Sequence, residues 1–176
     1  EDGIRVVAVT GVQTCALPIS ANHTVFAACD GAPATVVDTG YTAHSAMSLA
    51  LIDHALGDAP LQRVLNTHLH SDHCGGNAAL QARDPGVQVW VPAASEALVR
   101  AWDEDRLSYR YTGQACPAFR VDAALVPGDA VTLGPATWQV HAAPGHDPDA
   151  VLLFEPQTRT LLAGDALWED RLAIIF

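Results

Sequence analysis

Residues 67–76 read THLHSDHCGG and concentrate side chains that bind metal ions. His68, His70, Asp72 and His73 stand within six residues, after a short apolar run and before two glycines. Imidazole nitrogens and carboxylate oxygens are the ligands that borderline metals such as zinc prefer. A solvated, idle loop is the alternative, but four ligand-type residues between a strand-like run and a glycine turn favour a metal site.

The spacing divides these ligands between two ions. Residues two apart at the end of an extended segment point the same way, so His68 and His70 can converge on one ion. Asp72 and His73 then face elsewhere as the chain turns, and we expect them to serve a second, nearby ion. Cys74 can approach the metals, but a small buried side chain is the favoured interpretation.

Two later strand ends offer further ligands. In APGH, residues 143–146, a proline and a glycine constrain the backbone before His146, which we predict to be the third nitrogen ligand of the first ion. The dipeptide GD ends another strand-like run, and its carboxylate, Asp165, can bridge two cations and lower their mutual repulsion.

Strands and helices alternate in the pattern that must position these residues. Apolar runs and turn residues predict hairpins and helices. The predicted strands cover residues 24–29, 34–37, 61–67, 87–91, 121–133 (with a turn), 137–142, 151–154 and 160–163. The predicted helices cover residues 42–56, 77–83 (with Asn77 as the cap) and 96–102, and residues 103–119 show no clear period.

Composition limits the class of protein. The 176 residues, 49% of them apolar, suffice for one compact domain. The net charge of −11 and the absence of lysine disfavour a nucleic-acid partner. No apolar run approaches the ~20 residues of a membrane span. We therefore expect a cytoplasmic protein with a small-molecule substrate and no membrane partner; its oligomeric state is undetermined. The four cysteines show no CxxC spacing, which argues against a disulfide framework.

Residues 1–20 are predicted to be foreign to the domain. Residues 11–20, GVQTCALPIS, resemble a translated sequencing adapter, and the chain begins with Glu1 rather than methionine. We expect a single domain over residues 21–176.

The motifs, in this order, resemble those of the metallo-β-lactamase-fold hydrolase superfamily. The resemblance covers residues 22–168 and includes VDTG, THLHSDHCGG, APGHDPDA and LLAGDALW. It implies an α/β fold, an αββα sandwich with the metal site at one edge. Relative to this family the chain ends before a further histidine, so we expect truncation before the last strand and helix, an incomplete second half and a second metal site one ligand short.

By this resemblance, three histidines hold the first ion, and an aspartate, a histidine and a shared aspartate hold the second. The first set is His68, His70 and His146; the second is Asp72, His73 and Asp165. Asp165 resembles the bridging carboxylate of the glyoxalase II and lactonase-like branch, which true β-lactamases of this fold generally lack.

The implied function is hydrolysis of a small ester, thioester or lactone by a dinuclear zinc centre. Asp72 is the catalytic candidate, because it can orient the attacking water and accept its proton. Asp38, in VDTG, is a candidate to fix an imidazole tautomer, with a structural loop role as the alternative. Two rival interpretations remain. One is a mononuclear non-haem iron oxygenase resembling persulfide dioxygenases, with His68, His146 and Asp165 as ligands. The other is an inactive fragment of the hydrolase.

Overall fold

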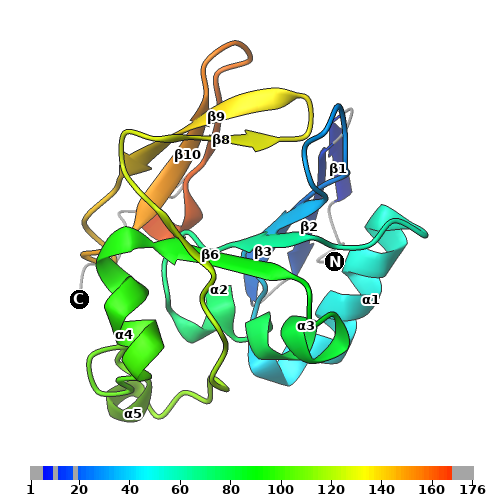
Figure 1. Cartoon of the computed structure of the whole chain (residues 1–176). Coiled ribbons are helices and arrows are strands. Elements are labelled where there is room, and N and C mark those ends of the chain that lie inside the picture. Colours follow the sequence, from blue (N-terminus) through cyan, green and yellow to red (C-terminus); the bar gives the residue numbers. More distant parts are fainter. Residues whose placement is uncertain (1–5, 10–11, 18–19, 168–176) are drawn as a thin grey trace, which may run out of the picture.

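Two β-sheets pack face to face, and helices cover the outer face of the first sheet (Figure 1). The computed structural model describes residues 6–9, 12–17 and 20–167 of the chain. This layering confirms the predicted α/β fold. In the described part of the chain, the helical segment after β8 is the short η3 turn, so these residues contain one helix layer and two sheets.

The first sheet has seven strands in the order of the sequence. Strands β1 to β4 pair antiparallel, whereas β4 to β7 pair parallel. The strands are β1 (Val6–Val9), β2 (Val12–Leu17), β3 (Ser20–Phe26), β4 (Thr35–Val37), β5 (Arg63–Leu65), β6 (Gln88–Pro92) and β7 (Ala123–Leu125). Because β4 and β5 are parallel neighbours, the loops after them leave the sheet at the same edge.

Alternating side chains of the first sheet build two separate cores. In β4, Val36 packs on the helix side and Val37 on the side of the second sheet; Val64 and Leu65 of β5 divide in the same way. All four side chains are buried. A sheet covered on both faces requires such continuous apolar strands.

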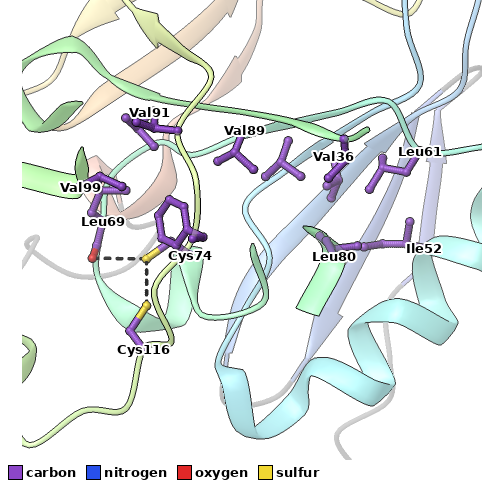
Figure 2. Packing of buried hydrophobic residues seen from close by; sticks show 14 of the residues in the cluster. Val36, Ile52, Leu61, Leu69, Cys74, Leu80, Val89, Val91, Val99 and Cys116 are labelled. Atoms are coloured by element: carbon purple, nitrogen blue, oxygen red, sulfur yellow. Dashed lines mark hydrogen bonds between the residues drawn. The ribbon is translucent and has the colours of Figure 1, made fainter. Parts of the chain in front are cut away.

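The helix layer packs over the first core. Figure 2 shows Ile52 of α1 and Leu80 of α3 turned toward strand residues such as Val89. The helical segments are η1 (Thr42–His44), α1 (Ser45–Leu56), α2 (Ser71–Cys74), α3 (Asn77–Arg83), η2 (Ala93–Ser95), α4 (Glu96–Ala101), α5 (Tyr109–Thr112) and η3 (Gly164–Ala166).

The second sheet is an antiparallel meander in the order β11, β10, β9, β8. Its strands are β8 (Ala130–Leu133), β9 (Ala136–Ala142), β10 (Val151–Glu155) and β11 (Thr160–Leu162). Trp138 of β9 and Leu153 of β10 pack against the first sheet, where the Trp138 ring meets Phe26 edge-on at 5.5 Å between centroids. The exposed alternate residues face away, as period-two patterning requires.

Most predicted elements form, with two differences. The strands predicted within residues 121–133 belong to different sheets, since β7 extends the first sheet and β8 starts the second. Asn77 does not cap its helix; Gly76 occupies that position, and the Asn77 side chain bonds Thr39 and Asn66 instead. The Asn77 side-chain amide, which the sequence predicted to cap the helix, instead belongs to a buried polar network.

Two predicted features lie near the ends of the described residues. Residues 12–17 of the adapter-like stretch form β2, paired with β1 and β3. A strand conformation is compatible with either origin, so the foreign origin of residues 1–20 stays a prediction. Residue 168, the last of the LLAGDALW motif, lies outside the described residues. Among the described helices, none is long and apolar enough to cross a membrane.

Candidate metal centre

The predicted ligands gather where strands of both sheets end. His68 follows β5, His70 precedes the single turn of α2, and Asp72 and His73 lie within that turn. The second sheet contributes His146 from the loop after β9 and Asp165 from η3 after β11. The two contributions are joined directly, because the Val151 N–H at the start of β10 donates to the Thr67 carbonyl at 2.8 Å.

Three imidazole rings converge on one point. The His70 Nδ1 atom lies 3.2 Å from His68 Nε2 and 2.9 Å from His146 Nε2. Four-coordinate zinc with Zn–N bonds of about 2.0–2.1 Å separates its nitrogen ligands by roughly 3.3 Å, close to these distances. His68 and His146 are buried and His70 is half-buried. We call this set the nitrogen cluster.

His73 and two carboxylates form a second group beside it. The His73 Nε2 atom lies 3.3 Å from Asp165 Oδ1 and 3.7 Å from Asp72 Oδ2. Both separations exceed the 2.7–2.9 Å of a strong charged hydrogen bond. The other oxygen of Asp165, Oδ2, lies 3.5 Å from His146 Nε2. Asp165 therefore presents one oxygen to each group. We call His73, Asp72 and Asp165 the acidic cluster.

Asp38 orients one histidine of each cluster. It follows β4 with a positive φ of 58°, a conformation that aspartate tolerates better than most residues. Its Oδ2 accepts hydrogen bonds from His73 Nδ1 at 2.8 Å and from the Thr67 hydroxyl at 2.8 Å. The Thr67 oxygen lies 3.1 Å from His68 Nδ1, which can donate to it. These bonds assign the protons to Nδ1 and turn both Nε2 lone pairs toward the clusters.

The electrostatics of the two clusters differ. Burial lowers the pKa of His68, and the neighbouring histidines lower it further; burial likewise lowers the pKa of His70. Burial also disfavours charge on His73, but Asp38, Asp165 and Asp72 outweigh it and raise its pKa to about 10. Desolvation raises the pKa of Asp165, yet the hydrogen bond and charge of His73 lower it on balance. Without a cation, a proton on His73 balances the carboxylates.

The turn that carries Asp72 and His73 is fixed by buried polar groups. The His73 carbonyl accepts hydrogen bonds from the Thr39 N–H at 2.8 Å and from Asn66 Nδ2 at 2.9 Å. Asn77 completes the network, since its side chain donates to Asn66 and accepts from Thr39, both at 2.7 Å. This network fixes the turn that carries Asp72 and His73, the two ligands predicted there.

Gly75 and Gly76 are required for space rather than for unusual dihedral angles. Their φ angles, −61° and −82°, suit any residue. A Cβ on Gly75 would lie 2.5 Å from the Thr42 nitrogen, and one on Gly76 would lie 2.5 Å from the Thr39 oxygen. The two glycines therefore serve close packing rather than an unusual backbone conformation. They allow the loop after β4 to pack directly on the metal motif.

Three residues near the clusters escaped prediction. Thr67 is the first letter of the motif and links His68 to Asp38. Asp147, next to His146 in the sequence, lies 3.7 Å from His70 Nε2, the nitrogen that faces away from the cluster. Tyr41, half-buried after VDTG, has its pKa raised by burial and by the charges of Asp72 and Asp165. Adjacency to a predicted ligand was the available signal for Thr67 and Asp147.

The donor set fits divalent metal ions. One group, His68, His70 and His146, offers three nitrogens, and another, His68, His73 and Asp165, offers two nitrogens and an oxygen, with the atoms of each group within 4.8 Å of one another. Hard and borderline ligands of this kind suit zinc and related metals. Fold and site together define a metal-binding α/β protein whose centre lies at one edge of a two-sheet sandwich.

The chain belongs to the metallo-β-lactamase superfamily, whose family model matches residues 19–174. Among curated proteins it is 37% identical over 147 residues to a hydroxyacylglutathione hydrolase of Anaeromyxobacter dehalogenans, covering 84% of this chain and 46% of that protein. It is 32% identical to the hydroxyacylglutathione hydrolase of Pseudomonas putida, covering 89% of this chain and 52% of that protein. The chain thus spans about half the length of these relatives. The predicted family and its glyoxalase II-like relatives are confirmed.

Solved structures agree with the fold. A β-lactamase domain protein from Burkholderia ambifaria is 28% identical with a TM-score of 0.69, covering 90% of this chain and 53% of that one. The BLEG-1 B3 metallo-β-lactamase is 24% identical with a TM-score of 0.70, covering 90% of this chain and 73% of that one, a likeness that concerns the fold alone.

Proposed function

We propose that this chain holds two divalent ions, zinc foremost, and hydrolyses a small ester, thioester or lactone. The observation that carries the proposal is the position of Asp165, with Oδ1 at 3.3 Å from His73 Nε2 and Oδ2 at 3.5 Å from His146 Nε2. A carboxylate that spans two ligand groups suits a pair of cations, because it lowers their mutual repulsion.

The relatives support the class of substrate. The two curated relatives described above are 37% and 32% identical to this chain, and both are named hydroxyacylglutathione hydrolase. That name describes hydrolysis of an acyl derivative of glutathione. The net charge of −11 without lysine favours a small molecule over a nucleic acid.

Each ion would have its own ligands. The nitrogen cluster would hold the first through His68 Nε2, His70 Nδ1 and His146 Nε2. The acidic cluster would hold the second through His73 Nε2, Asp72 and Asp165, with Asp165 shared. Asp38 and Thr67 keep the imidazole protons on Nδ1, so that the Nε2 lone pairs are available to the ions.

A pair of bound divalent ions supplies Lewis-acid chemistry, polarising a carbonyl and making water a nucleophile near neutral pH. Asp72 is placed to assist, because its carboxylate is part-exposed and lies on the rim of the acidic cluster, 3.7 Å from His73 Nε2. We assign Asp72 to orient the attacking water and to accept its proton. Buried His68 and His73 take no part in proton transfer, since their Nδ1 protons serve Thr67 and Asp38.

The mononuclear iron alternative uses only His68, His146 and Asp165. It leaves His70, His73 and Asp72 without a role, although all three lie at the same centre. The geometry therefore favours two ions. Elemental analysis with an oxygen-consumption assay separates the two, because the oxygenase requires iron and consumes oxygen.

The decisive experiment compares His146→Gln with His141→Gln. His146 is buried at the nitrogen cluster, whereas His141 is an exposed histidine five residues earlier, on β9. In zinc-loaded protein we expect His146→Gln to lower kcat/KM on an ester, thioester and lactone panel by about 10³-fold, since several kcal/mol of Lewis-acid stabilisation is lost.

The same variant should lose about one zinc ion per chain by elemental analysis, and His141→Gln should match the parent protein in both measurements. Equal activity of the two variants, or a parent protein that hydrolyses nothing on the panel while carrying two zinc ions, would contradict the proposal.

A further inference from the structure

Two cysteines far apart in the sequence meet beneath the metal motif. Cys74, the last residue of α2, and Cys116, in the irregular segment after α5, have their sulfur atoms 3.7 Å apart (Figure 2). Both side chains are buried, Cys74 completely and Cys116 with 8% of its surface exposed. Neither belongs to the metal-ligand groups described above.

The surroundings keep the two thiols facing each other. The Cys74 sulfur lies 3.1 Å from the Tyr109 hydroxyl and 3.3 Å from the His70 carbonyl. Tyr109 in turn donates to the Leu69 carbonyl at 2.7 Å, and Ser71 donates to Gln114. These bonds pack the segment that carries Cys116 against the turn that carries Cys74. They therefore keep the two sulfur atoms near each other.

We propose that Cys74 and Cys116 form a reversible disulfide that fastens residues 113–119 to the metal-motif turn. A disulfide has an S–S length of about 2.05 Å, so closure requires the sulfurs to approach by roughly 1.7 Å. The loop that would be closed spans 42 residues of separation. Cys116 lies two residues beyond the Gln114 contact and outside any helix or strand, so this short approach breaks no helix or strand hydrogen bond at Cys116.

The reaction with hydrogen peroxide gives each cysteine a distinct role. Cys116, the more accessible sulfur, attacks a peroxide oxygen; the O–O bond breaks, a sulfenic acid forms and one water leaves. The Cys74 sulfur then attacks the Cys116 sulfur, forming the S–S bond and releasing a second water. Two thiols lose two electrons in total, which peroxide accepts. The contact with the Cys74 thiol lowers the pKa of Cys116, which agrees with this order.

Peptide mapping tests the bond directly. The chain has no lysine, so trypsin cleaves only after arginine and yields peptides 64–83 and 111–120, each with one of the two cysteines, and peptide 6–63 with Cys15 and Cys29. After treatment of the full chain with peroxide, we expect peptides 64–83 and 111–120 to appear as one species lacking two hydrogen atoms, and to separate again with dithiothreitol.

A second readout is thermal unfolding. The oxidised chain should melt about 5 °C or more above the reduced chain, because the bond restricts the unfolded state. Cys116→Ser and Cys116→Ala should abolish the linked peptide and the shift, while Cys29→Ser should retain both. Peroxide that oxidises Cys29 without joining the two peptides would overturn the inference, as would a linked chain with an unchanged melting temperature. Peptide mapping and thermal unfolding do not depend on hydrolytic activity. A failure of the disulfide proposal can therefore be told apart from a failure of the proposed hydrolase function.

Discussion

The nitrogen cluster and the acidic cluster lie side by side but differ in charge. His68, His70 and His146 offer three ring nitrogens, and burial lowers the pKa values of His68 and His70, which favours the neutral form of these two rings. In the acidic cluster, His73 has a pKa raised to about 10 between carboxylates. The nitrogen cluster is therefore favoured to accept a cation directly, whereas in the acidic cluster a proton on His73 competes with the cation.

This difference shows how one strand-end motif can serve two sites. Both halves draw on residues 67–76, and Asp38 supports one histidine of each. Asp72 and Asp165 both lie against His73, whereas of these two carboxylates only Asp165 reaches the nitrogen cluster, with Oδ2 3.5 Å from His146 Nε2. Carboxylates near a ligand raise its attraction for cations and for protons alike. We infer that the two halves bind metal with different pH dependence and different sensitivity to substitution.

The largest effect is expected from Asp38→Asn. Asparagine has the same shape and tolerates the positive φ at this position, so the backbone is preserved. Its amide would present N–H donors to His73 Nδ1 and to the Thr67 hydroxyl, which favours the wrong imidazole tautomers. Loss of such an orienting partner typically weakens metal affinity 10- to 100-fold. Zinc titration against a chromophoric chelator should show weakening near the upper limit at both halves.

Asp58→Asn is the matched control, since Asp58 is exposed and lies away from the clusters, between α1 and β5. It should leave both affinities unchanged. If Asp38→Asn weakened the binding of only one ion, the idea that Asp38 reaches His68 through Thr67 would be wrong.

The sequence predicted the ligands because their chemistry is local to the chain. The order of His68, His70, Asp72 and His73 behind an apolar run predicts a metal site at a strand end, and the short constrained loop before His146 predicts a further ligand at another strand end. The six predicted ligands do lie together in the structure. Their roles as ligands stay a proposal, and so does the assignment of Asp72 as the catalytic residue.

Other features depend on contacts between distant segments, which no local pattern records. A side chain on Gly75 would meet the nearby Ser71 carbonyl, but both Gly75 and Gly76 also face backbone atoms of residues 39–42, more than 30 positions away. The network that removes Asn77 from its capping role joins three segments. The split of residues 121–133 between two sheets likewise reflects packing around two cores, because β7 is the last strand of the parallel half of the first sheet, whereas β8 belongs to the sheet that covers its other face.

A smaller effect, about tenfold per pH unit, should separate the two halves by pH. In the metal-free protein, His73 is protonated below about pH 10 and must release that proton before Nε2 can bind an ion. Raising the pH from 7 to 9 lowers the concentration of the competing proton, so the affinity of the acidic cluster should rise over this range and level above pH 10. The nitrogen cluster should change less, since the pKa values of His68 and His70 are lowered.

The measurement is a zinc titration at pH 7, 8 and 9, corrected for the pH dependence of the competing chelator. The His146→Gln variant serves as a companion, because it impairs the nitrogen cluster and leaves the ligands of the acidic cluster intact. Two ions with the same pH slope in the parent protein would show that the charge difference between the clusters does not control binding.

The smallest effect is expected from Asp147→Asn, which probes the nitrogen cluster alone. Asp147 Oδ2 lies 3.7 Å from His70 Nε2 and its side chain is part-exposed, so it supports the ring through a weak, solvent-screened interaction. We expect zinc affinity to fall about threefold at the nitrogen cluster, below the 10- to 100-fold typical of a buried orienting partner, and not at the acidic cluster. Asp149→Asn is the neighbouring comparison, because Asp149 bonds Ser95 rather than a histidine. Should Asp147→Asn weaken both halves equally, His70 would have to be coupled to the acidic cluster through Asp165, and the division into two clusters would no longer describe the site.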